Sequence, residues 1–369
     1  MRITPIAEIN LQHLKENFQL IQRLCPDAAV MPVVKADAYG HGIIPITNAL
    51  INAGATGFCV ALISELERLI NHNISLPILH LGRLYKELLQ LTINRNIWCT
   101  LNSVDDLQLL DDHFTKTGSI TTVHMKIDTG MGRLGVLPEE AFEIANALSN
   151  HPGVNLEGLW SHLSTADEKD PSYSNYQIKL FDETTTKIIN TIPGISYRHI
   201  ANSSAIIKYS KSHFNMVRPG IALYGVLPYD DPKSKLKPVM EFKAPVTLIR
   251  KMSKGSSIGY NRKYILDTDR IVATVQAGYA DGVNTALCNT GCVSFGSKLL
   301  NIVGKISMDQ MAIDVTGIKI KPGDFVTIWG GDNKETQVEK VASGISKIPY
   351  ELLTSLSNRV EMKIIQEKN

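Results

Sequence analysis

The sequence predicts an α/β protein with an N-terminal (β/α)8 barrel followed by a mostly β C-terminal domain. Three observations support this prediction. Apolar, β-branched segments alternate with helical stretches through the first two thirds of the chain, a polar, proline-bounded linker interrupts the alternation at residues 229–238, and strand-like segments then follow one another with only turn residues between most of them. The length of 369 residues also suits about two domains.

Eight strand candidates of the first domain share short apolar runs rich in Val, Ile and Leu. They are residues 30–35, 57–61, 78–81, 97–100, 123–127, 156–160, 197–201 and 220–224. Apolar side chains recur at helical spacing between them, most clearly in residues 11–21, 62–69, 103–110 and 138–148. Strands separated by helices cannot pair as hairpins, so they form a parallel sheet. Eight such units fit a closed TIM barrel, with a doubly wound open sheet as the alternative.

The segments after the linker predict a second, mostly β domain. The strand candidates there are residues 244–251, 270–277, 292–295, 299–305, 311–315 and 325–329, and only residues 337–345 and 350–356 have helical patterns. We therefore expect the barrel to occupy residues 10–232 and the C-terminal domain to occupy residues 233–369. Residues 1–9 are strand-like and precede the first barrel helix, so we expect them to pair with the second domain.

Composition and charge exclude several classes of protein. The 38 Lys and Arg residues nearly balance the 36 Asp and Glu residues, the formal net charge is +2, and no basic block offers a surface for nucleic acid. No apolar run approaches the roughly 18 residues that cross a bilayer, and the first residues lack the apolar core of a signal peptide. The five cysteines are scattered and have no ligand cluster beside them, so we expect reduced thiols and no metal site. These features predict a cytoplasmic protein with a small-molecule partner.

Residues that can do chemistry lie beside the ends of several predicted strands. They are Lys35 at the end of the first strand, Arg133 in the glycine-rich turn after the fifth, His162 after the sixth, Ser203 after the seventh and Arg218 before the eighth. Each has an ordinary structural explanation when taken alone, because strand-end lysines reach solvent and buried histidines are often simply hydrogen-bonded. In a parallel barrel, however, the loops at these ends meet at one mouth, where barrel enzymes carry their active sites.

Two features of this mouth suggest pyridoxal phosphate. A lysine amine at the end of an apolar strand has its pKa lowered by burial and by nearby arginines, which makes it a nucleophile toward an aldehyde. The turns at residues 202–204 and 220–221 offer hydroxyl and backbone N–H groups, which are common donors to phosphate. A reactive lysine and a phosphate cradle match the two ends of this cofactor.

Seven segments, taken in order, resemble the sequence motifs of alanine racemases. They are residues 33–42 (VVKADAYGHG), residues 128–135 (DTGMGRLG), His162, residues 202–203 (NS), residues 217–225 (VRPGIALYG), residues 278–282 (GYADG) and residues 307–310 (SMDQ). The similarity runs over essentially the whole chain. It implies a pyridoxal-phosphate-dependent isomerase with an N-terminal barrel, a C-terminal β domain, and a homodimer whose active sites lie between the barrel of one subunit and the β domain of the other.

The resemblance also implies roles for individual residues. Lys35 would form the internal aldimine with pyridoxal 5′-phosphate. The phosphate would be held by Tyr39, Ser203, Gly220 and Ile221. Arg218 would face the pyridine nitrogen, Arg133 would bridge the phenolic oxygen of the cofactor and the substrate carboxylate, and His162 would lie beside Tyr260 across the dimer interface. Tyr279 and Met308 would complete the substrate pocket from the partner chain.

The reaction implied is the interconversion of L-alanine and D-alanine, which supplies D-alanine for the peptidoglycan of the cell wall. Inversion at carbon by proton removal requires access to both faces of a planar carbanion, so two bases on opposite sides suit it. Lys35 would serve one face and Tyr260 the other. A guanidinium such as Arg218 stays charged and cannot give a full proton to the pyridine nitrogen, which keeps the carbanion weakly delocalised and limits side reactions.

Three positions extend or depart from the family pattern. Lys126 stands where relatives often carry a carbamylated lysine that orients the neighbouring arginine, and an ordinary strand lysine is the alternative. Ser307 stands where many relatives have cysteine. Asn358 replaces a tyrosine that some relatives use to contact the phosphate and restrict the pocket.

Other functions remain open from these residues. A barrel-type decarboxylase of basic amino acids would place a carboxylate opposite the pyridine nitrogen, and Arg218 argues against that. A pyridoxal phosphate carrier would not need the second domain with Tyr260 and Met308. A racemase with a broader range of amino acids is not excluded by the motifs.

Overall fold

The structure is a computed structural model that describes residues 4–229, 231 and 235–365. The predicted domain boundary between residues 232 and 233 and both extreme ends of the chain lie outside the described residues. The chain forms two compact units. One contains residues 17–38 and 43–223, and the other contains residues 39–42 together with the described residues up to 16 and from 224 onward.

Eight parallel strands form the first unit. Six of them make one sheet in chain order: β3 (Phe58–Val60), β4 (Ile78–His80), β5 (Ile97–Leu101), β6 (Thr121–Lys126), β7 (Val154–Trp160) and β8 (Tyr197–His199). The other two strands, β2 (Ala29–Val30) and β9 (Met216–Val217), pair with each other. A bridge from Val33 to Cys59 joins β2 to β3, and the Arg218 N–H donates to the Ala201 carbonyl beside β8. The strands therefore close into a ring, which confirms the predicted (β/α)8 barrel.

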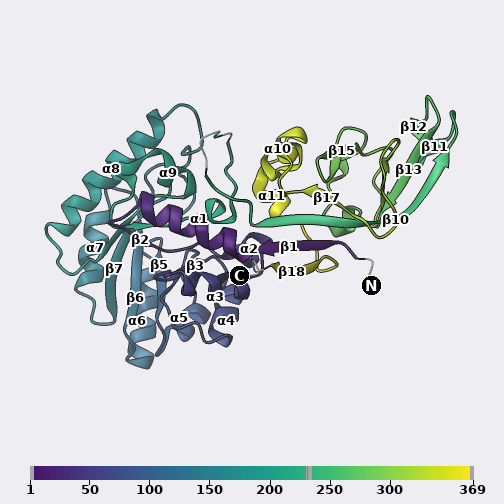
Figure 1. The fold of residues 1–369 in the computed structure, drawn as a ribbon. Helices are drawn as coiled ribbons and strands as arrows, with labels where there is room; N and C mark the ends of the chain where they lie inside the picture. Colours follow the sequence, from purple (N-terminus) through teal and green to yellow (C-terminus); the bar gives the residue numbers. More distant parts are fainter. Residues whose placement is uncertain (1–3, 230, 232–234, 366–369) are drawn as a thin grey trace. The chain divides into compact units, whose positions relative to one another are not determined.

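Helices follow most of these strands and cover them on the outside (Figure 1). They are α1 (Leu11–Leu24), α2 (Lys35–Gly40), α3 (Ile43–Asn52), α4 (Ile63–Asn71), α5 (Lys86–Thr92), α6 (Asp106–Thr117), α7 (Ala141–Ser149), α8 (Ser172–Ile189) and α9 (Ser203–Lys208), with the short 3-10 turn η1 (Ser210–Ser212). Strands β3, β4 and β5 are buried along their whole length, as expected where side chains fill a barrel inside and helices cover it outside.

The eighth predicted strand is displaced along the chain. Residues 221–224 form a 3-10 turn, η2 (Ile221–Tyr224), and the strand is Met216–Val217. Pro219 has no N–H to donate to a ladder, and Gly220 has no side chain to pack, so the strand ends before them. Arg218 therefore follows the last barrel strand instead of preceding it, and lies at the same kind of strand end as His162.

The second unit is built on one eight-stranded sheet. Strand β10 (Met240–Met252) lies beside β1 (Ile6–Asn10), which continues to β18 (Glu361–Ile365) (Figure 1). On its other side are β17 (Phe325–Trp329), β14 (Cys292–Phe295) and β15 (Lys298–Asn301), and β10 also pairs with β13 (Arg270–Val275), which pairs with β16 (Met311–Asp314). Residues 6–9 run antiparallel to residues 240–243, and residues 6–10 run parallel to residues 361–365.

Smaller elements complete the second unit. A hairpin of β11 (Ser257–Ile258) and β12 (Tyr264–Ile265) encloses the 3-10 turn η3 (Tyr260–Arg262). The others are η4 (Tyr279–Asp281), η5 (Thr285–Leu287), η6 (Lys334–Thr336), α10 (Val338–Gly344) and α11 (Pro349–Leu353). Sequence reasoning missed this hairpin and β18, because both are short and lack an alternating apolar pattern. Within the described ranges, the structure contains no helix with the length and apolarity that a membrane crossing requires.

Candidate active site

Lys35 is the first residue of α2, a short helix that is left-handed over most of its length. The four residues after it have φ angles of 52° to 55°, and Gly40 has a φ of 80°, so α2 is left-handed from Ala36 to Gly40. Left-handed helix costs a residue with a side chain about 1–2 kcal/mol, because its Cβ crowds the following carbonyl oxygen. Strain of this size persists only where surrounding contacts enforce it, and it is common at functional sites.

Packing in the second unit holds the end of this turn. The ring of Tyr39 lies 4.9 Å from that of Tyr224 and 6.1 Å from that of Tyr350, centre to centre. A side chain at Gly40 would place its Cβ 2.2 Å from the Leu353 carbonyl oxygen, which is closer than atoms can approach. Gly40 is therefore required both by its φ angle and by this close approach.

The amine of Lys35 has a low affinity for a proton. Burial lowers its pKa from the ordinary value, the positive charge of Arg133 lowers it further, and Glu65 acts in the opposite direction. The smaller influence of Cys59 also raises it. The amine is therefore more often unprotonated near neutral pH than an exposed lysine, which is what attack on an aldehyde requires.

Arg218 is buried just after β9 and takes part in a network of hydrogen bonds that links it to His199 on β8 and His124 on β6. Its guanidinium donates to His199 Nδ1 at 2.5 Å and to the Ser161 carbonyl at 2.8 Å, and lies 4.7 Å from the centre of the Trp160 ring. Arginine only donates, so His199 must accept at Nδ1 and carry its proton on Nε2. That nitrogen faces His124 Nδ1 at 2.8 Å. The chain of contacts thus fixes the tautomer of both histidines.

His124 and His199, the two histidines of this hydrogen-bonded network, are neutral. Burial lowers the pKa of His124 to about 3, and Arg218 lowers it further. Burial and Arg218 also hold the pKa of His199 well below 6.5. Arg218 itself has a pKa lowered to about 10 by burial, so it remains charged at neutral pH and faces only neutral acceptors in this chain.

Protein stability is expected to fall as the pH drops below 6.5. The unfolded chain binds a proton at His124 near pH 6.5, whereas the folded chain does so only near pH 3, so the stability present above pH 6.5 is lost between these values. Replacing His124 by Gln should reduce the slope of unfolding free energy against pH by about 1.4 kcal/mol per pH unit. Urea titrations at several pH values between 6 and 4 measure the free energy of unfolding and therefore this slope. The exposed His72→Gln variant is the control, and an unchanged slope in His124→Gln contradicts the assignment.

Positive charge accumulates around His162. Burial holds the pKa of this histidine well below 6.5, and Arg218, Arg133, Lys35 and Lys126 each lower it further, in that order of influence. The carboxylates that act on these lysines are Glu65 on Lys35 and Asp128 on Lys126. Four cations with two carboxylates leave an excess of positive charge, which an anionic ligand would neutralise.

The loop that carries Arg133 is ordered by hydrogen bonds between its backbone and two side chains, those of Asp128 and Lys126. Asp128 Oδ1 accepts the N–H groups of Gly130, Met131 and Gly132 at 2.8–3.1 Å. Lys126 Nζ donates to the Leu134 carbonyl at 2.5 Å, so the buried lysine contacts the residue after Arg133. Burial lowers the pKa of Lys126 to about 8. The Arg133 side chain itself is exposed in the single chain.

Ser203 lies at the start of α9, buried against the turn that follows β9. Its Oγ accepts the N–H groups of Gly220 at 2.9 Å and Ala222 at 3.2 Å. Gly220 thereby orders the serine, and Ile221 lies buried between the two donors at the start of η2. Because Oγ accepts both bonds through its lone pairs, its hydrogen remains to be donated to an anionic oxygen.

Tyr260, Tyr279 and Met308 lie in neighbouring loops of the second unit, with 67%, 48% and 51% of their surfaces exposed. The Tyr279 N–H donates to the Ser307 carbonyl, and the Ala280 N–H donates to the Met308 carbonyl, both at 3.0 Å. Large exposed aromatic and thioether side chains of this kind are typical of a surface that another molecule covers.

Further contacts hold these three loops together. A Cβ at Gly259 would lie 3.0 Å from the Lys305 backbone nitrogen, so the turn with Tyr260 packs on the segment before Met308. Arg359 spans the other two loops, with Nε 3.1 Å from Asp281 and Nη2 2.6 Å from Asp309. Asp281 is almost completely buried and also accepts the Gly278 N–H at 2.9 Å.

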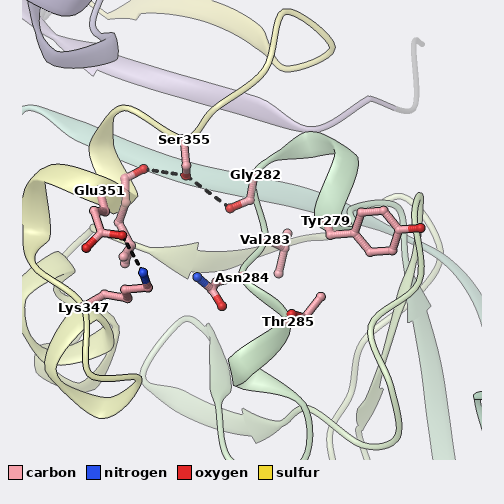
Figure 2. Close-up of a pocket in the computed structure, with 9 residues that line it drawn as sticks. Tyr279, Gly282, Val283, Asn284, Thr285, Lys347, Glu351 and Ser355 are labelled. Atoms are coloured by element: carbon pink, nitrogen blue, oxygen red, sulfur yellow. Dashed lines mark hydrogen bonds and ion pairs between the residues drawn. The ribbon is translucent and has the colours of Figure 1, made fainter.

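A pocket of about 310 Å³ lies beside the Tyr279 loop (Figure 2). Lys347 and Glu351 form an ion pair of 2.7 Å on one side of it, and Ser355 Oγ lies within hydrogen-bond distance of the Gly282 carbonyl on another. Figure 2 shows the ring of Tyr279 pointing away from the ion pair. Tyr279 is the one residue that this pocket shares with the residues predicted from the sequence.

Comparison with known proteins identifies the family. The family model "Alanine racemase, N-terminal domain" matches residues 9–228, and "Alanine racemase, C-terminal domain" matches residues 239–364. The chain belongs to the alanine racemase family. An alanine racemase of Clostridium novyi is 38% identical over 361 residues, covering 96% of this chain and 93% of that protein. One from Desulforamulus reducens is 36% identical, covering 96% and 97%.

Solved structures of alanine racemases have the same fold. That of Clostridium difficile 630 has a TM-score of 0.94 and 32% sequence identity, and the match covers all of this chain and 97% of the other. The Bacillus anthracis alanine racemase with bound L-Ala-P has a TM-score of 0.89 at 30% identity, covering 100% and 97%. The predicted family and enzyme class are therefore confirmed, and the protein is a racemase that depends on pyridoxal 5′-phosphate.

The barrel residues fit this cofactor. Lys35 would supply a desolvated amine for the aldehyde, and the positive excess around His162 suits the phosphate and phenolic oxygen. The Ser203 hydroxyl hydrogen can be donated to a phosphate oxygen. Arg218, charged and rich in donors, suits an unprotonated ring nitrogen.

Loss of the Ser203 hydroxyl is expected to weaken cofactor binding. A hydrogen bond to a charged group contributes about 1.5–3 kcal/mol, so Ser203→Ala should raise the Kd for pyridoxal phosphate roughly tenfold or more. Absorbance titration of the cofactor-depleted protein measures this value. Ser212→Ala is the matched control, because Ser212 is a buried serine of the same unit whose hydroxyl donates to the Tyr209 carbonyl. Equal Kd values for both variants would remove Ser203 from the phosphate site.

The predicted residues fall into two groups in the structure. One group in the first unit is joined by electrostatic interactions and contains Lys35, Lys126, Arg133, His162 and Arg218. In the same unit, Ser203 is hydrogen-bonded to the turn that contains Gly220 and Ile221. Tyr260, Tyr279 and Met308 belong to the second unit, as does Tyr39. The functional assignment of each residue stays a prediction.

Sequence reasoning missed several residues that support the site. His124, His199, Glu65 and Arg359 were not singled out, although each contacts or influences a predicted site residue or its loop. A signal was present for the two histidines, because each occupies a strand whose apolar neighbours predict burial. Arg359 had no such signal, since its partners are 50 or more residues away in the chain.

Proposed function

We propose that this chain is an alanine racemase that interconverts L-alanine and D-alanine through two bases, Lys35 and Tyr260. The observation that carries the proposal is the Lys35 amine, which is desolvated, follows a barrel strand, and shares its surroundings with Arg133, His162 and Arg218. The named relatives, which are alanine racemases, support alanine as the substrate.

Pyridoxal phosphate, when bound, withdraws electrons from the α-carbon of the amino acid and makes its proton acidic. Lys35 holds the cofactor and exchanges a proton on one face of the α-carbon. Tyr260 exchanges a proton on the other face, which allows the product to have the opposite hand. Burial favours the neutral form of the Lys35 amine, which is the form that accepts a proton.

The remaining residues bind and orient. Arg133 binds the substrate carboxylate, and Tyr279 and Met308 border the substrate from the second unit. Tyr39, Ser203, Gly220 and Ile221 hold the phosphate. Arg218, oriented by His199 and the Ser161 carbonyl, would donate a hydrogen bond to the ring nitrogen, and its pKa of about 10 would keep its proton on the guanidinium.

Lys126 is proposed to be carbamylated. Its pKa of about 8 leaves about a tenth of the amine neutral at pH 7, and the neutral amine is the form that adds carbon dioxide and releases a proton to give a carbamate. The resulting carboxylate would bring a negative charge to the loop that carries Arg133, where the amine already contacts Leu134. Intact-mass measurement under carbon dioxide and after its removal tests this modification.

We further propose a cytoplasmic homodimer that supplies D-alanine for peptidoglycan. Each active site would combine Lys35 of one subunit with Tyr260 of the partner subunit. The exposure of Tyr260, Tyr279 and Met308 supports a covered surface. The five cysteines are free thiols, as suits a reducing compartment. Residues 10–232 would serve as the cofactor-binding domain and residues 233–369 as the domain that completes the partner's site.

The test of the function is direct. The purified protein is incubated with L-alanine, then separately with L-serine and L-lysine, while optical rotation and the absorbance of the bound cofactor are followed. Loss of rotation with L-alanine is expected. Faster loss with L-serine or L-lysine would change the substrate, and no loss with any of them, together with no cofactor absorbance, would end the racemase proposal.

A further inference from the structure

The left-handed turn after Lys35 begins with a backbone N–H that the turn itself cannot satisfy. The Ala36 N–H lies in the first turn of α2, at its second residue, where a helix offers no acceptor. It donates instead to Glu65 Oε1 at 2.6 Å. Glu65 lies in α4 and is only 7% exposed, so this contact is shielded from water.

The second carboxylate oxygen of Glu65 accepts hydrogen bonds from the loop that precedes α4. Glu65 Oε2 accepts the N–H of Ala61 at 2.9 Å and that of Leu62 at 3.1 Å. One carboxylate therefore ties the residue after Lys35 to the loop that follows β3. Three backbone donors hold it, and no ion pair involving it occurs within the described part of the chain.

The helix α4 contacts the turn a second time. Arg68, three residues after Glu65, forms an ion pair of 2.8 Å with Asp37, whose carboxylate also accepts the Ile43 N–H at 2.9 Å. The Arg68–Asp37 pair is half exposed and contributes little by itself. The two consecutive residues after Lys35 are thus held by one helix, with the buried contact made by Glu65.

We propose that Glu65 is a positioning residue that holds the left-handed turn presenting the Lys35 amine, and that its carboxylate, bound 2.6 Å from the Ala36 nitrogen, places negative charge next to Lys35. This inference rests on the proposed function of Lys35. Two separate roles follow from it. As an acceptor, Glu65 stabilises a backbone conformation that is otherwise strained. As an anion, it offsets part of the positive charge that Arg133 brings to Lys35.

The acceptor role is measured first in the full-length wild-type protein. Hydrogen exchange of the Ala36 amide, followed by NMR, is expected to be at least about 100-fold slower than in an unstructured peptide, because the amide is bonded and shielded. This readout needs neither a variant nor catalysis. Exchange as fast as that of an exposed amide would overturn the proposal.

Two variants then separate the roles. Glu65→Ala removes the acceptor, so Ala36 exchange should accelerate at least about tenfold and capture of added pyridoxal phosphate by cofactor-depleted protein should slow about tenfold. Glu65→Gln loses the charge and keeps one acceptor oxygen, while its NH2 group cannot accept the backbone N–H groups that the other carboxylate oxygen holds. Its Ala36 exchange should therefore lie between those of the wild type and Glu65→Ala, and the pKa of Lys35 should fall, as measured by the pH dependence of cofactor capture. Glu67→Gln is the control on the same helix, because Glu67 is exposed.

The outcomes distinguish this inference from the proposed function. If the wild type captures cofactor and racemises alanine but both Glu65 variants match Glu67→Gln, the positioning role is wrong and the function stands. If the wild type fails to racemise alanine, the function is wrong, and the Ala36 exchange still decides whether Glu65 holds the turn. If Glu65→Ala does not fold, the wild-type exchange and the Glu65→Gln measurements decide.

Discussion

Replacement of Lys35 by alanine is expected to lower the rate of alanine racemisation by at least about a thousandfold. The variant loses the amine that holds the cofactor and one of the two proposed bases, and loss of a positioned acid–base group alone costs about 10²–10⁴ in rate. Polarimetry with L-alanine and with D-alanine measures the effect in both directions. Because one proton transfer on each path uses Lys35, both directions should lose activity together.

Chemical trapping of the cofactor on the protein tests the role of Lys35 independently of the rate. Borohydride reduction of the wild-type protein should leave the cofactor attached to the peptide that contains Lys35, and mass spectrometry should find no such product in Lys35→Ala. The control is Lys179→Ala, since Lys179 is exposed on α8 and forms an exposed ion pair with Glu183. Attachment at another lysine, or a variant that keeps wild-type activity, would remove Lys35 from the mechanism.

The barrel could be predicted from the sequence because its signal is local and repeated. Each strand is a short apolar run, and each helix repeats apolar residues at helical spacing, so the order of elements follows from the chain alone. The displaced eighth strand shows the limit of this approach. Residues 220–224 are as apolar as a strand, and only the preceding Pro219 indicates that the ladder has already ended at Val217.

The candidate site was predictable only in part, and the reason is physical. Lys35, Arg133 and His162 follow predicted barrel strands, so topology alone brings them to one mouth. Arg218 was expected before the eighth strand, and it follows that strand because the strand is Met216–Val217. The left-handed conformation of α2 could not be predicted in this way, because its residues have no intrinsic preference for positive φ. They are Ala36, Asp37, Ala38 and Tyr39. Contacts distant in sequence impose that conformation.

Glu65 illustrates the same limit. In the sequence it is one of two glutamates in an amphipathic helix, and its burial depends on the partner that it meets 29 residues earlier. The hydrogen-bonded histidines are similar, since His124 and His199 are 75 residues apart. Residues that support a site through long-range contacts become visible only once the chain is folded.

Replacement of Tyr260 by phenylalanine is expected to act on one face of the substrate. The change removes a single hydroxyl from an exposed ring, so the fold should be unaffected. Exchange of the α-hydrogen of L-alanine in deuterated water should fall by about 10²–10⁴, the usual contribution of an acid–base group, while exchange from D-alanine is partly retained through Lys35. NMR follows both exchanges. Tyr264→Phe, in the same hairpin, is the control. Equal loss from both enantiomers would contradict the assignment of one base to each face.

The two variants together test whether each site is shared between subunits. If Lys35 of one chain works with Tyr260 of the partner subunit, a dimer of one Lys35→Ala chain and one Tyr260→Phe chain has one site with both substitutions and one site with neither. Equal mixing with subunit exchange should then restore about a quarter of the wild-type activity from two inactive proteins. If both residues act within one chain, every site keeps a substitution and no activity returns. The mixture therefore shows which chain supplies the second base, independently of the size of either single effect.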